Sequence, residues 1–233
     1  MIKAITEFFS IKSSLLDKND ESSIEEIFFL NNQPQRKDRS HRYFNREIFT
    51  MRSFIQHVKL LQTQRKSMKK IFNEKIITKA FIERIMLTSS VVNGCVYCQW
   101  GHVGIAKGEG LTEKEISSLF NYDFSSVPAH EKPAVLFTYE YVRTKYHPKS
   151  EIIRYFKENY SKNEQKALIA IINMIIMGNR AGNTVSAFIS RLQGRKSLQS
   201  SLLFELIVFI PIGFLMHVMY KLSKFSPQIL SNT

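Results

Sequence analysis

Residues 167–177 (ALIAIINMIIM) place the strongest constraint on what this chain can fold into. Ten of the eleven residues are apolar, and Asn173 is the polar one. Ser161 and Glu164 precede this run at the spacing of a capping box, in which two side chains satisfy free backbone amides at the start of a helix. A helix that is apolar all round is buried on all sides. We therefore expect other helices to surround this one.

Helix signals recur along the rest of the chain, whereas short runs with the alternating pattern of strands are scarce. The hydrophobic fraction of 44% is ordinary for a globular protein, which excludes wholesale disorder. We predict an all-α fold built as a bundle of antiparallel helical hairpins. The other helices are expected at residues 45–75 (one helix or two), 76–92, 95–107, from Thr112 onward, 134–145 and 150–159.

Positive charge is concentrated in the first third of the chain. The formal net charge is +13, and residues 36–79 hold 13 Lys and Arg against 3 Asp and Glu. Such a stretch can bind nucleic acid or an anionic membrane surface, or it can form the solvated face of a helix. No helix-turn-helix, zinc-finger or RNP-type pattern accompanies it. We therefore favour the solvated face and expect no nucleic acid among the partners.

The two ends of the chain differ in character. Charges at Lys3, Glu7 and Lys12 interrupt the first apolar run, so we expect no export signal and a reducing, cytoplasmic location. Residues 202–220 (LLFELIVFIPIGFLMHVMY) carry two interpretations. One is a helix packed on the core or on a subunit interface, and the other is a peripheral or C-terminal membrane contact.

The two cysteines of the chain, Cys95 and Cys98, are three residues apart, and His102 follows four residues later. On a helix that begins near Cys95, the three side chains share one face. The first sulfur would then lie at the helix N-terminus, where free N–H groups and the helix dipole favour a thiolate. Two thiols at this spacing can close a disulfide, and a neighbouring imidazole can take a thiol proton. The pattern predicts a two-thiol redox site.

Glu83 lies twelve residues before Cys95 in an apolar setting. The intervening Asn93-Gly94 is a natural helix stop, because both residues tolerate positive φ. Antiparallel packing across that turn would bring Glu83 back over the start of the next helix. A buried carboxylate there would have a raised pKa and could act as a base. The alternative is an exposed Glu83 paired with Lys79 or Arg84.

Taken together, Glu83, Cys95, Cys98 and His102 resemble the active-site signature of the alkylhydroperoxidase D (AhpD)-like, peroxidase-related branch of the carboxymuconolactone decarboxylase superfamily. The resemblance extends over roughly residues 45–194. It implies an AhpD-like helical bundle that assembles as a homo-oligomer, a trimer or a hexamer. We accordingly divide the chain into a polar, basic extension (1–44), a catalytic helical domain (45–198) and a C-terminal apolar helix and tail (199–233).

The resemblance also implies a role for each residue of the signature. Cys98 is the peroxidatic cysteine, and Cys95 resolves its sulfenic acid as a disulfide. Glu83 and His102 relay the proton. The implied activity is that of a cysteine-based peroxidase in antioxidant defence, with a hydroperoxide substrate, a dithiol or protein thiol reductant, and no cofactor or metal. Tyr97 departs from members that have a histidine just before the second cysteine, and the cysteine pair argues against lactone decarboxylation.

Three alternatives stay open at the level of the sequence. Cys95, Cys98 and His102 also offer three zinc ligands, although a fourth is missing. The same cysteines could serve a thiol–disulfide oxidoreductase without peroxidase activity. The fold could also carry a non-enzymatic, membrane-associated member of the superfamily.

The residues that follow the apolar run have two interpretations of equal weight. Asn179, Arg180 and Asn183 either border the site or a neighbouring subunit, or they cap the end of the apolar helix. In the second case the chain would turn at Gly182, because glycine commonly follows a helix end.

Overall fold

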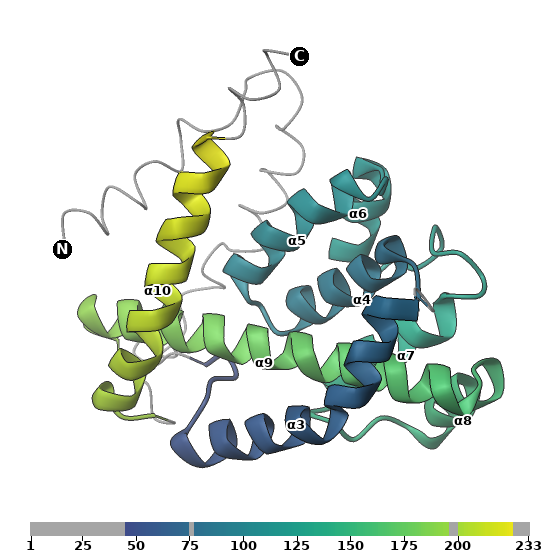
Figure 1. Cartoon of the computed structure of the whole chain (residues 1–233), viewed down its shortest axis with the longest axis horizontal. Coiled ribbons are helices and arrows are strands. Elements are labelled where there is room, and N and C mark those ends of the chain that lie inside the picture. The colour runs from purple at the N-terminus through teal and green to yellow at the C-terminus, as the bar shows by residue number, and fades with distance from the viewer. Residues whose placement is uncertain (1–44, 75–76, 196–199, 226–233) are drawn as a thin grey trace. The chain divides into compact units, whose positions relative to one another are not determined.

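The computed structural model describes residues 45–74, 77–195 and 200–225, which lie within the compact unit Lys37–Thr233. The predicted N-terminal extension, residues 1–44, falls outside the described residues. The predicted boundary between residues 198 and 199 also falls in a segment that is not described, so both domain boundaries stay predictions. Helix labels are those of Figure 1.

The described residues form eight helices and no strand, which confirms the all-α class. Residues 45–75 hold one helix rather than two. The predicted hairpin arrangement and the oligomer stay predictions. In chain order the helices are α3 (Met51–Glu74), α4 (Lys79–Val92), α5 (Val96–Gly108), α6 (Glu113–Phe120), α7 (Lys132–Arg143), α8 (Ser150–Asn159), α9 (Lys162–Leu192) and α10 (Leu202–Phe225).

Helix α9 lies at the centre of this arrangement, as the apolar run predicts. It contacts α3, α4, α5, α7, α8 and α10, and it crosses the middle of Figure 1 with α4 and α5 on one side and α3 on the other. The run 167–177, which is described throughout, has no exposed side chain. Its polar member, Asn173, donates from Nδ2 to Gln64 Oε1 (3.2 Å), and the Asn173 carbonyl lies 3.2 Å from His57 Nε2.

A buried group of charges fixes α4 against α6 and the start of α7. The Arg84 guanidinium donates from Nε to Glu115 (2.6 Å) and from Nη1 to Glu131 (2.8 Å). Burial raises the pKa of Glu131, and the charge of Arg84 opposes that shift. Arg84 pairs with these two carboxylates and Lys79 pairs with Glu109, while Glu83 is buried. The alternative of an exposed Glu83 paired with Lys79 or Arg84 is therefore wrong.

Helix α10 packs on the bundle along one side. Phe204 and Val208 belong to a buried cluster with Phe49. The fully buried Glu205 accepts two hydrogen bonds from Arg191 of α9, both 2.8 Å long. None of the described helices is both long enough and apolar enough to cross a membrane. The side of α10 away from this cluster is apolar and exposed at Leu203, Ile207, Ile210 and Phe214.

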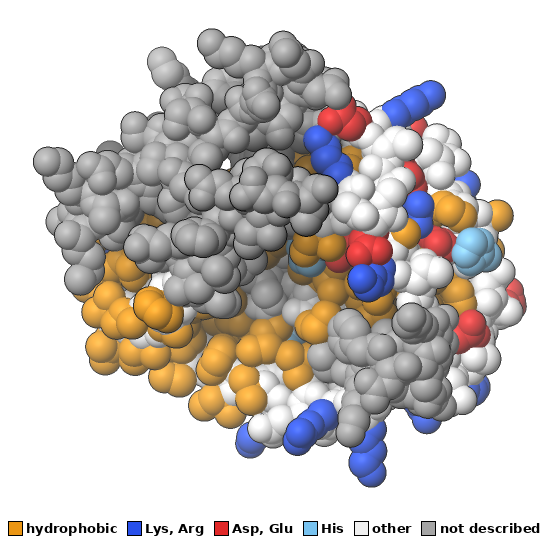
Figure 2. All heavy atoms as spheres, turned by 45° about the horizontal axis from the view of Figure 1, so that its top comes forward, with side chains coloured by type: hydrophobic (Ala, Val, Ile, Leu, Met, Phe, Trp, Pro, Cys, Tyr) orange, Lys and Arg blue, Asp and Glu red, His pale blue; other side chains and the backbone are white. Residues whose placement is uncertain are grey.

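The exposed surface has both apolar and basic areas. Figure 2 shows exposed hydrophobic side chains gathered at the lower left, with Lys and Arg side chains along the lower edge. On α3, the side chains of Arg52, Lys59, Arg65 and Lys66 are exposed. This part of the basic stretch is therefore exposed on a helix, and the absence of a nucleic-acid partner stays a prediction. Residues 36–44, 75 and 76 of the stretch lie outside the described residues.

Candidate active site

The turn between α4 and α5 determines where the cysteine pair lies. Gly94 has φ +64°, a conformation that suits glycine. The Gly94 N–H donates to the Val91 carbonyl (3.1 Å), and the Cys95 N–H donates to the Ser90 carbonyl (3.0 Å). These are the two hydrogen bonds of a Schellman motif, which ends α4 and satisfies its last carbonyls. Helix α5 therefore starts directly after a two-residue turn, as Asn93-Gly94 predicts.

Cys95 is the N-cap residue of α5, and its Sγ accepts a hydrogen bond from the Cys98 N–H (3.3 Å). Cys95 and Cys98 are joined in a disulfide, with their Cα atoms 5.3 Å apart. Cys95 is fully buried, whereas Cys98 is partly exposed. The first sulfur thus lies where the free amides of the helix N-terminus can stabilise a negative charge.

Glu83 and His102 meet across the α4–α5 turn. Glu83 is buried, with 6% of its surface exposed, and its Oε2 lies 2.8 Å from His102 Nδ1. A carboxylate accepts from the Nδ1–H tautomer, which leaves Nε2 of the ring for another partner. His102 follows Cys98 by one helical turn on α5, so the ring lies on the same helix face as the second sulfur. The structure therefore brings Glu83 to His102 and Cys95 to Cys98, and the catalytic roles of these residues stay predictions.

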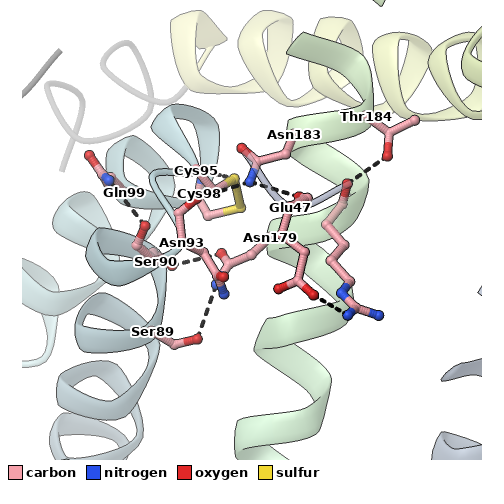
Figure 3. The surroundings of a disulfide bond; sticks show 11 residues. Glu47, Ser89, Ser90, Asn93, Cys95, Cys98, Gln99, Asn179, Asn183 and Thr184 are labelled. Atoms are coloured by element: carbon pink, nitrogen blue, oxygen red, sulfur yellow. Dashed lines mark hydrogen bonds and ion pairs between the residues drawn. A yellow bond between two sulfur atoms is a disulfide. The ribbon is translucent and has the colours of Figure 1, made fainter. Parts of the chain in front are cut away.

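Polar side chains of α9 hold this helix against the cysteine turn (Figure 3). Asn179 accepts from Ser90 Oγ (3.0 Å) and donates to Ser89 Oγ (3.1 Å). One turn later, Asn183 Nδ2 donates to the carbonyls of Asn93 (3.0 Å) and Glu47 (3.1 Å). Asn179 and Asn183 are both fully buried. The interpretation that these residues border the site is the one the structure supports.

Gly182 lies between these two asparagines and faces the disulfide. A Cβ at this position would lie 2.7 Å from Cys95 Sγ and 3.5 Å from Cys98 Sγ. The alternative prediction, a helix end with a turn at Gly182, is wrong, because α9 continues through this residue to Leu192. The contacts of the surrounding helices keep this glycine within a helix, where its lack of a side chain permits close packing.

Tyr97 occupies the position where some members of the resembled family have a histidine. Burial raises its pKa to about 12, although a hydrogen bond to Ser186 and the charge of Arg46 oppose the shift. The Tyr97 phenol therefore stays protonated at neutral pH. It therefore cannot replace a histidine as a base near neutral pH.

A second polar cluster lies next to the same part of α9 and was not predicted from the sequence. The Glu47 carboxylate accepts hydrogen bonds from Arg180 Nη2 and from the Tyr146 hydroxyl, the latter at 2.6 Å. Burial raises the pKa of Tyr146, and its hydrogen bond to Glu47 adds to the shift. Since Glu47 also bonds to Asn183, the cluster ties the segment before α3 to α9 beside the disulfide.

Unpaired polar atoms gather around the disulfide. Among the described residues, five buried side-chain polar atoms lack a hydrogen-bond partner. Buried polar groups are normally paired, so such atoms are candidates for contacts with water or a substrate. Three of the five belong to residues labelled in Figure 3, namely Asn93 Nδ2, Gln99 Oε1 and Asn183 Oδ1, and a fourth is Arg180 Nε on α9.

Among the described residues, no three His, Cys, Asp or Glu side chains are grouped to hold a metal ion. Two of the three zinc ligands considered from the sequence, Cys95 and Cys98, are bonded to each other.

Comparison with known proteins supports the resemblance. Residues 60–125 match the model of the carboxymuconolactone decarboxylase family. This segment contains all four residues of the predicted signature, Glu83, Cys95, Cys98 and His102. No curated protein and no solved structure gives a significant match. The family resemblance is thus confirmed over the segment that carries the cysteine pair.

Proposed function

We propose that this protein is a cysteine-based peroxidase that reduces hydroperoxides through a Cys95–Cys98 dithiol–disulfide cycle, in antioxidant defence. The observation that carries the proposal is the buried Glu83 carboxylate, 2.8 Å from His102 Nδ1 on the helix that begins at the cysteine pair. A carboxylate, an imidazole and two thiols on adjacent turns are the groups that thiol-based peroxide reduction needs.

In the first step, the Cys98 thiolate attacks one oxygen of the hydroperoxide. The O–O bond breaks, Cys98 becomes a sulfenic acid, and the alkoxide leaves as an alcohol after it takes a proton from the His102–Glu83 pair. In the second step, the Cys95 thiol condenses with the sulfenic acid, which forms the disulfide and releases water. A dithiol donor then reduces the disulfide by two exchange reactions and restores both thiols.

Exposure assigns the two sulfurs to different roles. Cys98 is the partly exposed residue of the pair, which supports its role as the cysteine that meets the peroxide and the dithiol donor. Cys95 is fully buried at the N-cap, where it is suited to resolve the sulfenic acid and later to leave as a thiolate. The hydrogen bond from the Cys98 N–H and the helix dipole stabilise that thiolate.

A thiol–disulfide oxidoreductase without peroxidase activity is the second candidate, because it would use the same disulfide. The two functions differ in whether Cys98 turns over a peroxide. By the resemblance to the carboxymuconolactone decarboxylase superfamily, we further propose that the protein works as a trimer or a hexamer.

The test uses fully reduced protein, checked for bound zinc, and an alkyl hydroperoxide with a dithiol reductant. We expect the parent to consume peroxide catalytically and Cys98→Ser to consume none. Cys95→Ser should react once and accumulate a Cys98 sulfenic acid, which dimedone labelling and mass spectrometry detect. Equal peroxide consumption by the parent and both variants would refute the peroxidase. Disulfide exchange without peroxide consumption would favour the second candidate.

A further inference from the structure

We infer that Gly182 of α9 is a positioning residue of the redox pair, because its missing side chain leaves the space that the bridged form of Cys95 and Cys98 occupies. The inference rests on the redox cycling of the two thiols that is part of the proposed function. It assigns to a residue of α9, 84 residues after Cys98, control over the balance between dithiol and disulfide.

The first step of the argument is the contact distance. A Cβ on Gly182 would lie 2.7 Å from Cys95 Sγ, closer than side-chain carbons approach other atoms in proteins. The same Cβ would lie 3.5 Å from Cys98 Sγ and 3.7 Å from Tyr97 Cδ2, which are ordinary contacts. The conflict is therefore with one atom, the buried sulfur of the disulfide.

The second step is that α9 is held in place on both sides of Gly182. Asn179, three residues earlier, bonds to Ser89 and Ser90 at the end of α4. Asn183, the next residue, bonds to the Asn93 carbonyl in the turn itself. A larger side chain at position 182 therefore clashes with Cys95 Sγ unless these buried hydrogen bonds break.

The third step is the difference between the two redox forms. In the disulfide, the bond to Cys98 fixes the position of Cys95 Sγ. In the dithiol, that bond is absent, so Cys95 Sγ is no longer tied to Cys98 and the side chain can adopt another rotamer about its Cα–Cβ bond. A methyl group on residue 182 therefore disfavours the bridged form more than the reduced form.

Gly178 provides a matched control on the same helix, one turn earlier. It is exposed, and a Cβ there would have no atom within 4 Å outside its own helix turn. Alanine is a better helix former than glycine, so both substitutions have the same intrinsic effect on α9. The two variants differ in their surroundings, because the new methyl group meets the disulfide and Tyr97 at the buried position 182 and no such atom at position 178.

The first experiment measures the thiol–disulfide equilibrium in glutathione buffers for the full chain, Gly182→Ala and Gly178→Ala. The reaction is protein dithiol plus oxidised glutathione to protein disulfide plus two reduced glutathione. We expect Gly182→Ala to shift this equilibrium at least tenfold toward the dithiol, about 30 mV for a two-electron couple, and Gly178→Ala to match the parent. A shift below twofold in Gly182→Ala would overturn the inference. Because no peroxide is involved, the result does not depend on peroxidase activity.

A second experiment separates this effect from a general packing defect. Cys95→Ala removes the sulfur that the methyl group would meet. We expect Gly182→Ala to lower the thermal midpoint of the oxidised parent but to leave it unchanged, or to raise it, in the Cys95→Ala background. Equal losses in the two backgrounds would show that the methyl group disturbs the helix and not the disulfide, and would refute the proposal. If Gly182→Ala alone fails to fold, recovery in the Cys95→Ala background supports it and failure there refutes it.

Discussion

Replacing Glu83 by Gln tests the proposed proton relay most directly. The substitution is nearly isosteric and removes the negative charge, while the Gln amide oxygen can still accept from His102 Nδ1. The buried carboxylate, 6% exposed and 2.8 Å from Nδ1, is the group that would take the proton through the ring. A positioned base contributes about 10²- to 10⁴-fold to a rate. We expect a loss near the lower limit, about 100-fold in kcat/KM for peroxide, or about 2.7 kcal/mol in activation free energy.

The assay is stopped-flow peroxide consumption by the reduced protein as a function of pH. Near pH 7 the variant should be slow, because few thiols ionise without the base. Above about pH 9, solvent deprotonates a thiol of ordinary pKa near 8.5, so the rate should return to within about tenfold of the parent. This recovery distinguishes a base from a residue that only supports the fold.

Two further measurements complete this test. The free energy of unfolding of Glu83→Gln should stay within about 1 kcal/mol of the parent, since a neutral hydrogen bond replaces a charged one as the buried charge is removed. Glu109→Gln, at a partly exposed carboxylate 3.1 Å from Lys79, is the matched control and should keep full activity. An unchanged rate at pH 7, or a loss that is equal at every pH, would refute the role of Glu83 as a base.

Two predictions concern the fold that supports the site. Arg191→Met leaves the fully buried Glu205 without its bidentate partner and should cost about 3–5 kcal/mol of stability, a fall of about 6–20 °C in Tm. Adding Glu205→Leu should restore most of this loss, and a loss in the double variant as large as in the single one would contradict this account. Burial lowers the pKa of His57 below its ordinary value of 6.5, so the unfolded chain takes up this proton first as the pH falls. Stability should therefore decline below about pH 6.5. Urea midpoints measured at about pH 7.5 and about pH 5.5 should show a smaller decline for His57→Gln than for the parent. An identical decline in parent and variant would exclude His57 as a cause.

The local parts of the site could be predicted from the sequence. Capping residues, the Asn93-Gly94 stop and the spacing of Cys95, Cys98 and His102 act over a few residues, and helix geometry converts them into positions. Glu83 was placed correctly near the next helix because a single short turn separates the two helices. The contact between Glu83 and His102 therefore joins two consecutive helices that a single short turn connects.

The contribution of α9 could not be predicted in the same way. Glycine and asparagine are typical of helix ends, so the sequence around Gly182 indicated a turn as readily as a contact. Which interpretation holds depends on the tertiary packing of a helix far along the chain. One signal was available: Asn179, Gly182 and Asn183 are spaced three and four residues apart, which places small and polar side chains on one face of an otherwise apolar helix.

The buried pair of Glu205 and Arg191 could not be predicted from the sequence either. A carboxylate in a hydrophobic run argues against a membrane span and offers no partner from the sequence alone. Its partner, Arg191, lies in the last turn of α9 and is separated from it by a segment with no distinctive pattern. Pairs of this kind follow from the docking of two helices, and local propensity carries no information about them.

The short turn between α4 and α5 has a consequence for the order of events during protein synthesis. The acid, the ring and both sulfurs lie within 20 residues of chain, from Glu83 to His102, whereas Gly182 is translated 84 residues after Cys98. Contacts that are close in sequence form fast, and distant ones form late. On the ribosome, the thiols therefore emerge and can be oxidised well before the helix that covers them exists. Whether Cys95 and Cys98 are reduced or bridged when α9 packs on them is therefore set by the redox conditions around the nascent chain.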